Sequence, residues 1–231
     1  MTVIDPCGSL AVVARHLSNR IAQGSTLWAV APELDDHAHH LAVEFVHPAS
    51  VGAMAVPAVA VCGEADRMLE KLRAQVRTGD VIVSMGYTDT FIVELSNRAV
   101  AWGADHVHLG WGQDPIASPL DPRSFCVQLG TDGSSERYLT RSYHLLWELT
   151  CICLQNRKLT SAPHDDVLVT TSCSVCADEA TTTEVTEVLT NDRARVRTAC
   201  GPEVIDISLL DNVRQHDLVL VHAGIALRRL S

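Results

Sequence analysis

Short apolar segments alternate with amphipathic ones through the first two thirds of the chain, and this alternation constrains the fold more than any other feature. The apolar segments have the length of strands: LWAVA at 27–31, PAVAVC at 57–62, GDVIVSMG at 79–86, DHVHLG at 105–110 and SFCVQLG at 124–130. Around them, apolar residues recur at helical spacing over 10–21, 35–46, 64–76, 88–102 and 136–156. Fully apolar strands are typical of a parallel sheet covered on both faces. We therefore predict a three-layer α/β domain over residues 1–158, with ligands bound beyond the carboxyl ends of its strands.

The pattern changes after residue 158. Residues 159–168 are polar and include a proline, which predicts a linker. Short alternating segments follow at close spacing, namely EVTEVL, RARVRT, EVIDIS and DLVLVH, with turn residues such as Asn191-Asp192 between them. Close spacing without helices predicts a small antiparallel β-barrel of the OB-like kind over residues 169–231.

Charge and hydropathy exclude several classes of function. The chain has 231 residues, with 18 Lys and Arg against 28 Asp and Glu, and a formal net charge of −10. An acidic chain without a basic run is a poor match for nucleic acid or an anionic membrane, so we expect neither as a partner. No apolar run approaches the ~20 residues that a bilayer helix needs. The N-terminal segment MTVIDPCGSL lacks the pattern of a secretory signal, so we expect a cytoplasmic protein.

The eight cysteines do not indicate a disulfide framework in a cytoplasmic protein. Four of them lie in apolar strand-like or helix-like segments and are predicted to be buried small hydrophobic side chains: Cys62, Cys126, Cys151 and Cys153. Cys173 and Cys176 form a C-x-x-C in a polar stretch, a pattern of metal and redox sites. A second C-x-x-C is absent from the sequence, which argues against a structural Cys₄ zinc site.

Two His–Glu pairs at i, i+4 spacing are candidates for catalysis. His40 and Glu44 lie on one predicted helix, and His144 and Glu148 lie on another. This spacing puts each pair on one helix face. Together they form a candidate acid/base site or a 2-His–2-carboxylate zinc site. The alternative is that they are ordinary side-chain pairs beside a surface groove.

Residues 10–156 resemble a SIS (sugar isomerase) domain of the phosphoheptose isomerase branch. The segments that carry the resemblance are AHHLAVEFVHP at 38–48, GDVIVSMGYTDTFIVELSNRAVAWGADHVHLGWG at 79–112 and YHLLWEL at 143–149. The resemblance implies a flavodoxin-like sheet, a sugar phosphate bound by two Ser/Thr- and Gly-rich loops, and aldose–ketose isomerisation by proton transfer. It supports His40 and Glu44 as zinc ligands or proton-transfer groups, supports His144 less, and makes a homodimer through this domain plausible.

The two loops that resemble the family's phosphate cradles differ from the family pattern. The first reads APELDD at 31–36, where the family has Gly, Asn and Ser. The second reads SMGYTD at 84–89 and keeps Ser84, Gly86 and Thr88 as candidate ligand-binding residues. Phosphate sites use closely approaching backbone N–H groups and disfavour negative charge. We therefore expect weakened phosphosugar binding and no isomerase activity on sedoheptulose 7-phosphate, although whether the protein is an enzyme stays open.

Residues 169–231 resemble the HypC/HupF chaperones of [NiFe]-hydrogenase assembly. The resemblance is carried by SCSVCADEA at 172–180, ACGPEVIDISLLDNV at 199–213 and HDLVLVHAGIALRRL at 216–230. It implies that a cysteine and His222, which ends the strand DLVLVH, hold or contact the iron of an Fe(CN)₂CO group. Cys173 and Cys176 compete for this role, and the spacing to the next strand favours Cys176. The implied partners are a HypD-type scaffold and the precursor of the hydrogenase large subunit.

The two resemblances together predict hydrogenase maturation as the function, with the first domain as a docking or regulatory unit. Two alternatives remain. One is an active phosphoheptose (sedoheptulose 7-phosphate) isomerase with an appended chaperone-like module. The other is a SIS regulator that senses a phosphosugar without turning it over.

Overall fold

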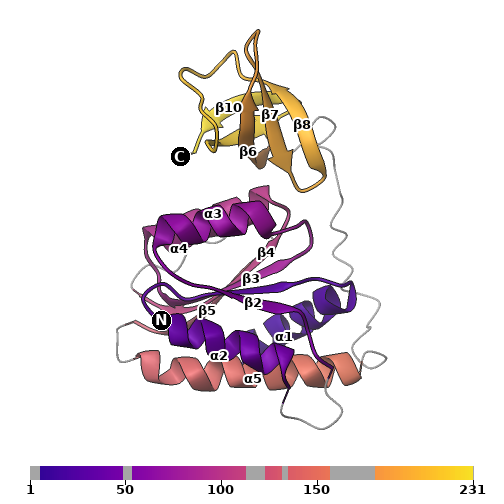
Figure 1. The fold of residues 1–231 in the computed structure, drawn as a ribbon, viewed down its shortest axis with the longest axis vertical. Coiled ribbons are helices and arrows are strands. Elements are labelled where there is room, and N and C mark those ends of the chain that lie inside the picture. The colour runs from indigo at the N-terminus through magenta and orange to yellow at the C-terminus, as the bar shows by residue number, and fades with distance from the viewer. Residues whose placement is uncertain (1–5, 49–53, 113–122, 132–134, 157–179, 231) are drawn as a thin grey trace.

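The computed structural model describes residues 6–48, 54–112, 123–131, 135–156 and 180–230. They form an α/β domain and a separate closed β-barrel (Figure 1). The helices are α1 (Pro6–Ala22), α2 (Asp35–Val46), α3 (Ala65–Gln75), α4 (Thr90–Ala101) and α5 (Glu136–Gln155). The sheet strands are β1 (Leu27–Val30), β2 (Ala58–Val61), β3 (Val81–Tyr87), β4 (Asp105–Trp111) and β5 (Ser124–Gly130). The barrel strands are β6 (Thr181–Val188), β7 (Arg193–Thr198), β8 (Gly201–Asp206), β9 (Leu218–His222) and β10 (Ile225–Arg229).

The five strands of the α/β domain all run parallel, in the order β2-β1-β3-β4-β5. This is the flavodoxin-like order, in which the chain reverses its direction of winding between β1 and β3. The structure therefore confirms the parallel sheet predicted from the apolar segments, with strand and helix positions close to the predicted ones.

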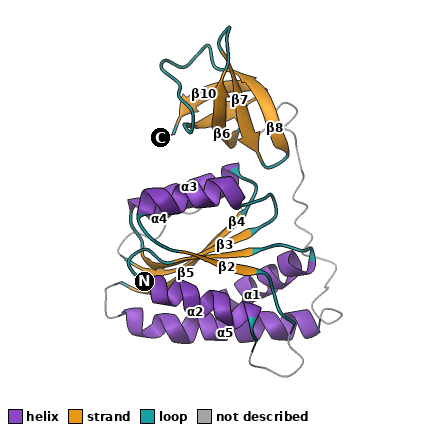
Figure 2. Ribbon diagram, in the orientation of Figure 1, coloured by secondary structure: helices purple, strands orange, loops and turns teal. Residues whose placement is uncertain are grey.

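Helices cover both faces of this sheet. Helices α1, α2 and α5 lie on one face and α3 and α4 on the other, as Figure 2 shows. Alternation along β3 sends Val83 and Met85 toward the first group of helices and Ile82 toward the second. Because both faces are dry, the strands read as nearly continuous apolar segments, which is why the sequence predicted them well.

The barrel contains one parallel pair of strands. Its order is β10-β8-β7-β6-β9, closed by the antiparallel pairing of β9 with β10. The pairing of β8 with β10 is parallel, which corrects the predicted all-antiparallel barrel. Strand β10 was not predicted, because it is mostly exposed and lacks an alternating apolar pattern. The OB-like class of this barrel stays a prediction.

Strands β9 and β10 are joined by the two-residue turn Ala223-Gly224. Both residues have positive φ, 49° and 80°, as the tight type I′ hairpin requires. The turn leaves His222 at the end of β9, paired in register with Ile225, as predicted. His222 is partly buried there.

The barrel is fixed to α3 and α4 by a buried carboxylate. Glu184 on β6 is 1% exposed and accepts hydrogen bonds from Arg73 Nε at 2.7 Å, Arg98 Nη1 at 2.8 Å and the indole N–H of Trp102. Arg197 on β7 donates to two backbone carbonyls at the C-terminal end of α3, at 2.9 and 2.6 Å. Charged side chains of each domain thus form hydrogen bonds with groups of the other domain, in the interface between the barrel and helices α3 and α4.

Several predictions fall on residues that the structure does not describe. The linker 159–168, the domain boundaries beside it, Cys173 and Cys176 all lie outside the described residues. Among the described residues, no helix combines the length and the apolar character needed to cross a membrane.

The four cysteines predicted to be buried differ in exposure. Cys151 on α5 is buried, as predicted. Cys62, Cys126 and Cys153 are partly exposed, which corrects their predicted burial. The reason lies in position, because Cys62 follows the edge strand β2 and Cys126 lies on the edge strand β5.

Candidate functional site

A cavity of about 1070 Å³ opens at the carboxyl ends of the parallel strands. Its walls are the segments that follow β1, β2 and β3 and the first turns of the helices behind them. Tyr87 at the end of β3 and Trp111 at the end of β4 contribute two aromatic rings. The cavity therefore lies at the β1/β3 switch point, where sheets of this order bind their ligands. We call it the crevice.

The acidic loop after β1 lines the crevice, as the sequence analysis expected. Glu33, Asp35 and Asp36 are all among its lining residues. Glu33 has a φ of 63°, a left-handed conformation that is uncommon for residues other than glycine. The position that a phosphate cradle takes in the resembling family is thus occupied by carboxylates.

Ser84, a predicted ligand-binding residue, is fully buried beneath α4. Its Oγ lies 2.8 Å from His106 Nε2 and 2.8 Å from His108 Nδ1. Because Ser84 has one hydroxyl proton, it donates to one imidazole and accepts from the N–H of the other. Thr88 Oγ1 lies 3.1 Å from His108 Nε2 and extends this buried chain. The hydroxyl groups of Ser84 and Thr88 therefore form hydrogen bonds with buried histidines inside the protein.

The buried histidines are neutral. Desolvation lowers the pKa of His106 to about 3, with a smaller contribution from His108, and it lowers the pKa of His108 to about 4. The arrangement requires glycine at position 110, because a Cβ there would overlap His108 Nε2 and the carbonyl oxygen of Gly86. Gly86 itself is buried at the end of β3, below the side chain of Leu34.

His40, Glu44 and His144 form one compact group where α2 lies beside α5. His40 Nε2 is 3.3 Å from Glu44 Oε1 and 3.2 Å from His144 Nε2, and His144 Nε2 is 3.5 Å from Glu44 Oε1. His40 and His144 are each a little under half exposed, and Glu44 is more buried. The structure thus brings together three of the four residues predicted from the i, i+4 pairs. Glu148, one turn further along α5, is exposed and lies outside the group.

Two further side chains support this group. Tyr143 Oη lies 2.9 Å from His40 Nδ1 and 3.4 Å from His37 Nδ1. It also donates to Thr140 Oγ1 at 3.4 Å. His37 lines the crevice, so it connects the crevice with the His40 group.

The sequence analysis did not predict His37 or Tyr143. A signal was present for His37, because residues 37, 40 and 44 follow i, i+3, i+7 spacing on one helix face. For Tyr143 no local signal existed, since its role depends on how α5 packs against α2.

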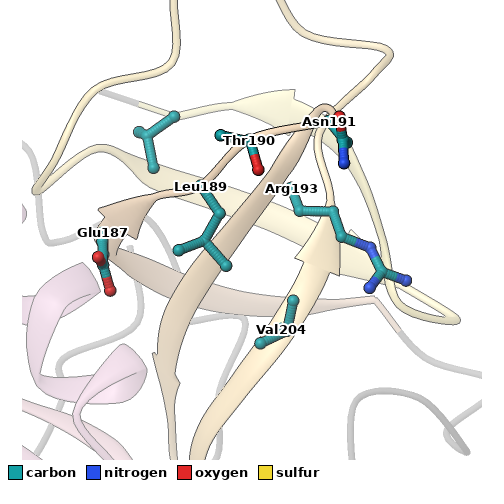
Figure 3. Close-up of a pocket in the computed structure, with 7 residues that line it drawn as sticks. Glu187, Leu189, Thr190, Asn191, Arg193 and Val204 are labelled. Carbon is teal, nitrogen blue, oxygen red and sulfur yellow. The ribbon is translucent and has the colours of Figure 1, made fainter.

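A second hollow, of about 690 Å³, lies on the barrel at the β6–β7 hairpin (Figure 3). Leu189, Val204 and Arg193 are among the side chains around it. It brings together no set of catalytic or metal-binding side chains among the described residues. The candidate site is therefore the crevice with the adjoining His40 group.

The fold is similar to those of two solved phosphoheptose isomerases. The protein from Francisella tularensis is 12% identical, with a TM-score of 0.57 over 65% of this chain and 88% of that chain. The protein from Neisseria gonorrhoeae is 16% identical, with a TM-score of 0.50 over 66% of this chain and 86% of that chain. The α/β domain thus has the SIS sugar isomerase fold. No family model matches the chain, and a search of curated proteins finds no match.

These structural neighbours contradict the prediction of hydrogenase maturation and favour the sugar-isomerase alternative. The comparisons give no support to a HypC/HupF segment at 169–231. The physical reason is that VHAG describes a strand followed by a type I′ turn, in which Val221 fills the barrel core and Ala223-Gly224 reverses the chain. A barrel hairpin of any function can use this pattern.

The iron group, the HypD-type scaffold and the hydrogenase precursor follow from hydrogenase maturation alone. Because hydrogenase maturation is contradicted, these partners and the iron group are not proposed further. The same holds for the iron-binding role of His222, Cys173 and Cys176. A homodimer through the SIS domain stays a prediction.

Proposed function

We propose that the α/β domain is an aldose–ketose isomerase whose reacting groups are His37 and the His40 group. The observation that supports this most strongly is the convergence of three donor atoms within 4.8 Å of one another, next to a crevice at the switch point of the sheet. Such an isomerase moves a proton between two adjacent sugar carbons, one of which is part of the carbonyl group. It therefore needs a carbonyl-polarising group and a proton-transfer group on the same sugar.

The donor set fits a zinc ion. Two imidazoles and one carboxylate, with a fourth position left open, are the ligands of catalytic zinc sites. Tetrahedral zinc with ligand bonds of ~2.1 Å separates its donor atoms by about 3.4 Å. The three separations here are 3.2, 3.3 and 3.5 Å. When bound, the ion would polarise the sugar carbonyl as a Lewis acid.

The protein's own residues have defined roles in this proposal. His40 would present Nε2 to the metal as one of its three ligands, while its Nδ1–H donates to Tyr143 Oη and fixes the ring. The hydroxyl group of Tyr143 in turn donates a hydrogen bond to Thr140 Oγ1, which supports this orientation. His37 lines the crevice and is the group that takes the proton from one carbon and returns it to the next.

Zinc affinity should depend on the three donors. We expect His40→Ala and His144→Ala to weaken zinc binding by at least 100-fold, and Tyr143→Phe by about 10-fold, because the Tyr143 hydroxyl group orients the His40 ring. Titration of the metal-free protein with zinc, read by calorimetry, measures this. Glu148→Gln is the matched control and should bind as the unaltered protein does. Equal affinity in the His40 and Glu148 variants would exclude the metal site.

Isomerisation should depend on His37 as well. We expect the zinc-loaded protein to exchange the C2 proton of an aldose with deuterium from the solvent, measured by NMR. His37→Gln should slow this exchange by roughly 10²- to 10⁴-fold while zinc affinity stays the same. The substrates are sugars with and without a phosphate, and sedoheptulose 7-phosphate is expected to give no turnover. Absence of exchange with every sugar would reject the isomerase and leave a domain that binds without turnover.

A further inference from the structure

The crevice is lined by carboxylates and has no Lys or Arg among its lining residues, although Lys71 lies just outside, where its Nζ donates to the Cys62 carbonyl at 3.3 Å. Of its lining side chains, six are acidic: Glu33, Asp35, Asp36, Glu64, Asp89 and Glu136. None of these six forms an ion pair with Lys or Arg within the described part of the chain. The sequence also contains no Lys or Arg at 21–66, 78–97, 99–122 or 124–136, which includes the loops that follow β1, β2 and β3.

Carboxylates of the protein lie at all three helix N-termini around the crevice, and one of them caps its helix. Asp35 and Asp36 lie in the first turn of α2, and Glu64 immediately precedes α3. Asp89 caps α4 and accepts a hydrogen bond from Ile92 N at 3.0 Å. Helix N-termini bind phosphate when their amide groups and positive dipole ends are free. Here Asp89 caps α4, and the carboxylates beside the uncapped N-termini of α2 and α3 add negative charge there, so a phosphate dianion would meet net negative charge.

The two buried acids of this domain, Asp80 and Asp105, behave differently. At the opposite, amino end of the sheet, Asp105 is paired with Arg20 and His16, and Asp80 accepts from the indole of Trp28 at 3.0 Å. Those carboxylates are buried and hold the fold together. The crevice acids instead face an open cavity, where their charge is available to a ligand.

Aromatic rings complete the lining. Phe91 and Trp111 are nearly buried, while Tyr87 is more than half exposed. The faces of such rings attract ammonium groups when a cation comes within about 6 Å of the ring centre. Carboxylates combined with aromatic faces in one cavity select for positive charge and against phosphate.

We propose that the crevice binds an amine-bearing small polyol, that is, an amino sugar in its protonated form. This inference rests on the proposed function, since it names the substrate class of the same site. The ammonium group contacts the carboxylates and aromatic rings of the crevice, while the sugar carbonyl lies toward His37 and the His40 group. The crevice therefore differs in ligand charge from the phosphate cradle that the SIS resemblance implies.

Three probes of matched size test the ligand charge: glucosamine, glucose and glucose 6-phosphate. Binding to the full chain is measured by calorimetry at pH 7 and low salt. We expect glucosamine to bind at least 10-fold more tightly than glucose, and glucose 6-phosphate at least 10-fold more weakly than glucose. The advantage of glucosamine should shrink at 0.5 M salt, because the carboxylates are partly exposed and are screened. Equal affinity for glucosamine and glucose, tighter binding of the phosphate, or no binding of any probe would overturn the inference.

Charge reversal provides a second readout. The double variant Glu33→Lys/Glu64→Lys should lose at least 10-fold in glucosamine affinity and gain affinity for glucose 6-phosphate. Glu70→Gln, an exposed carboxylate on α3 outside the crevice, is the matched control and should leave all three affinities unchanged. A double variant with unaltered charge preference would contradict the assignment.

The His40→Ala variant separates this inference from the proposed function. Its preference for glucosamine should persist although isomerisation is lost, because the crevice carboxylates are intact. If no sugar is isomerised but the preference for glucosamine is retained, the proposed isomerase activity is rejected and the amino-sugar inference stands. If a phosphorylated sugar is isomerised and glucosamine is not preferred, the amino-sugar inference is rejected and the proposed isomerase activity stands.

Discussion

Glu184→Ala is expected to lower the free energy of unfolding by about 3–5 kcal/mol, which is the usual cost of removing one partner from a buried ion pair. The side chain of Glu184 is 1% exposed, and Arg98, one of its donors, is 7% exposed. Without the carboxylate, Arg98 and the indole N–H of Trp102 lose their shared acceptor inside the interface. Denaturation with urea, followed by far-UV circular dichroism, measures the change.

Glu187→Ala on the same strand is the matched control. Glu187 is 53% exposed and pairs with Arg195 at the surface. Exposed pairs of this kind contribute roughly 0–1 kcal/mol. If both variants lost less than 1 kcal/mol, the buried carboxylate would not be what fixes the barrel to α3 and α4.

Acid is expected to destabilise the protein through His106 and His108. In the folded state His106 stays neutral down to a pH of about 3 and His108 down to about 4, whereas in the unfolded chain they protonate below about 6.5. Between these limits the unfolded state binds more protons, so stability falls as the pH falls. At pH 5 the two groups together should cost about 4 kcal/mol relative to pH 7.5. Urea denaturation at a series of pH values measures this loss.

Single substitutions assign the effect to these residues. His106→Gln or His108→Gln should reduce the slope of unfolding free energy against pH, between pH 6 and 5, by about 1.2 kcal/mol per pH unit. The slope is informative even where a variant is less stable overall at neutral pH. His39→Gln, an exposed histidine on α2, is the control and should not change the slope. Unaltered slopes in all three variants would show that the buried histidines take up protons without unfolding.

The spacing of apolar residues along the sequence predicted most helices and strands of the α/β domain. Helix α2 begins and ends where its apolar spacing predicted, at Asp35 and Val46. The sheet strands were equally clear, because a strand buried on both faces is apolar throughout. Strand β10 was missed because its residues are mostly exposed, and the parallel pairing of β8 with β10 depends on how the barrel closes.

The candidate site was predicted in part. The i, i+4 rule brought His40 and Glu44 together, since both lie on one helix face. Whether His144 or Glu148 joins them depends on the rotation of α5 against α2. The packed helices bring His144 to the group and leave Glu148 exposed, and sequence spacing alone treats the two as equals.

The sequence by itself determined the period of each segment, the acidic character of the loop after β1 and the absence of Lys and Arg from the loops that follow β1, β2 and β3, because these are properties of neighbours in the chain. The tertiary structure decided everything that depends on which distant elements meet. It buried Ser84 between His106 and His108, joined Tyr143 to His40, and seated Glu184 between Arg73 and Arg98. In each case the partners are more than 20 residues apart or on different elements, so their contact is a result of packing and not of local preference.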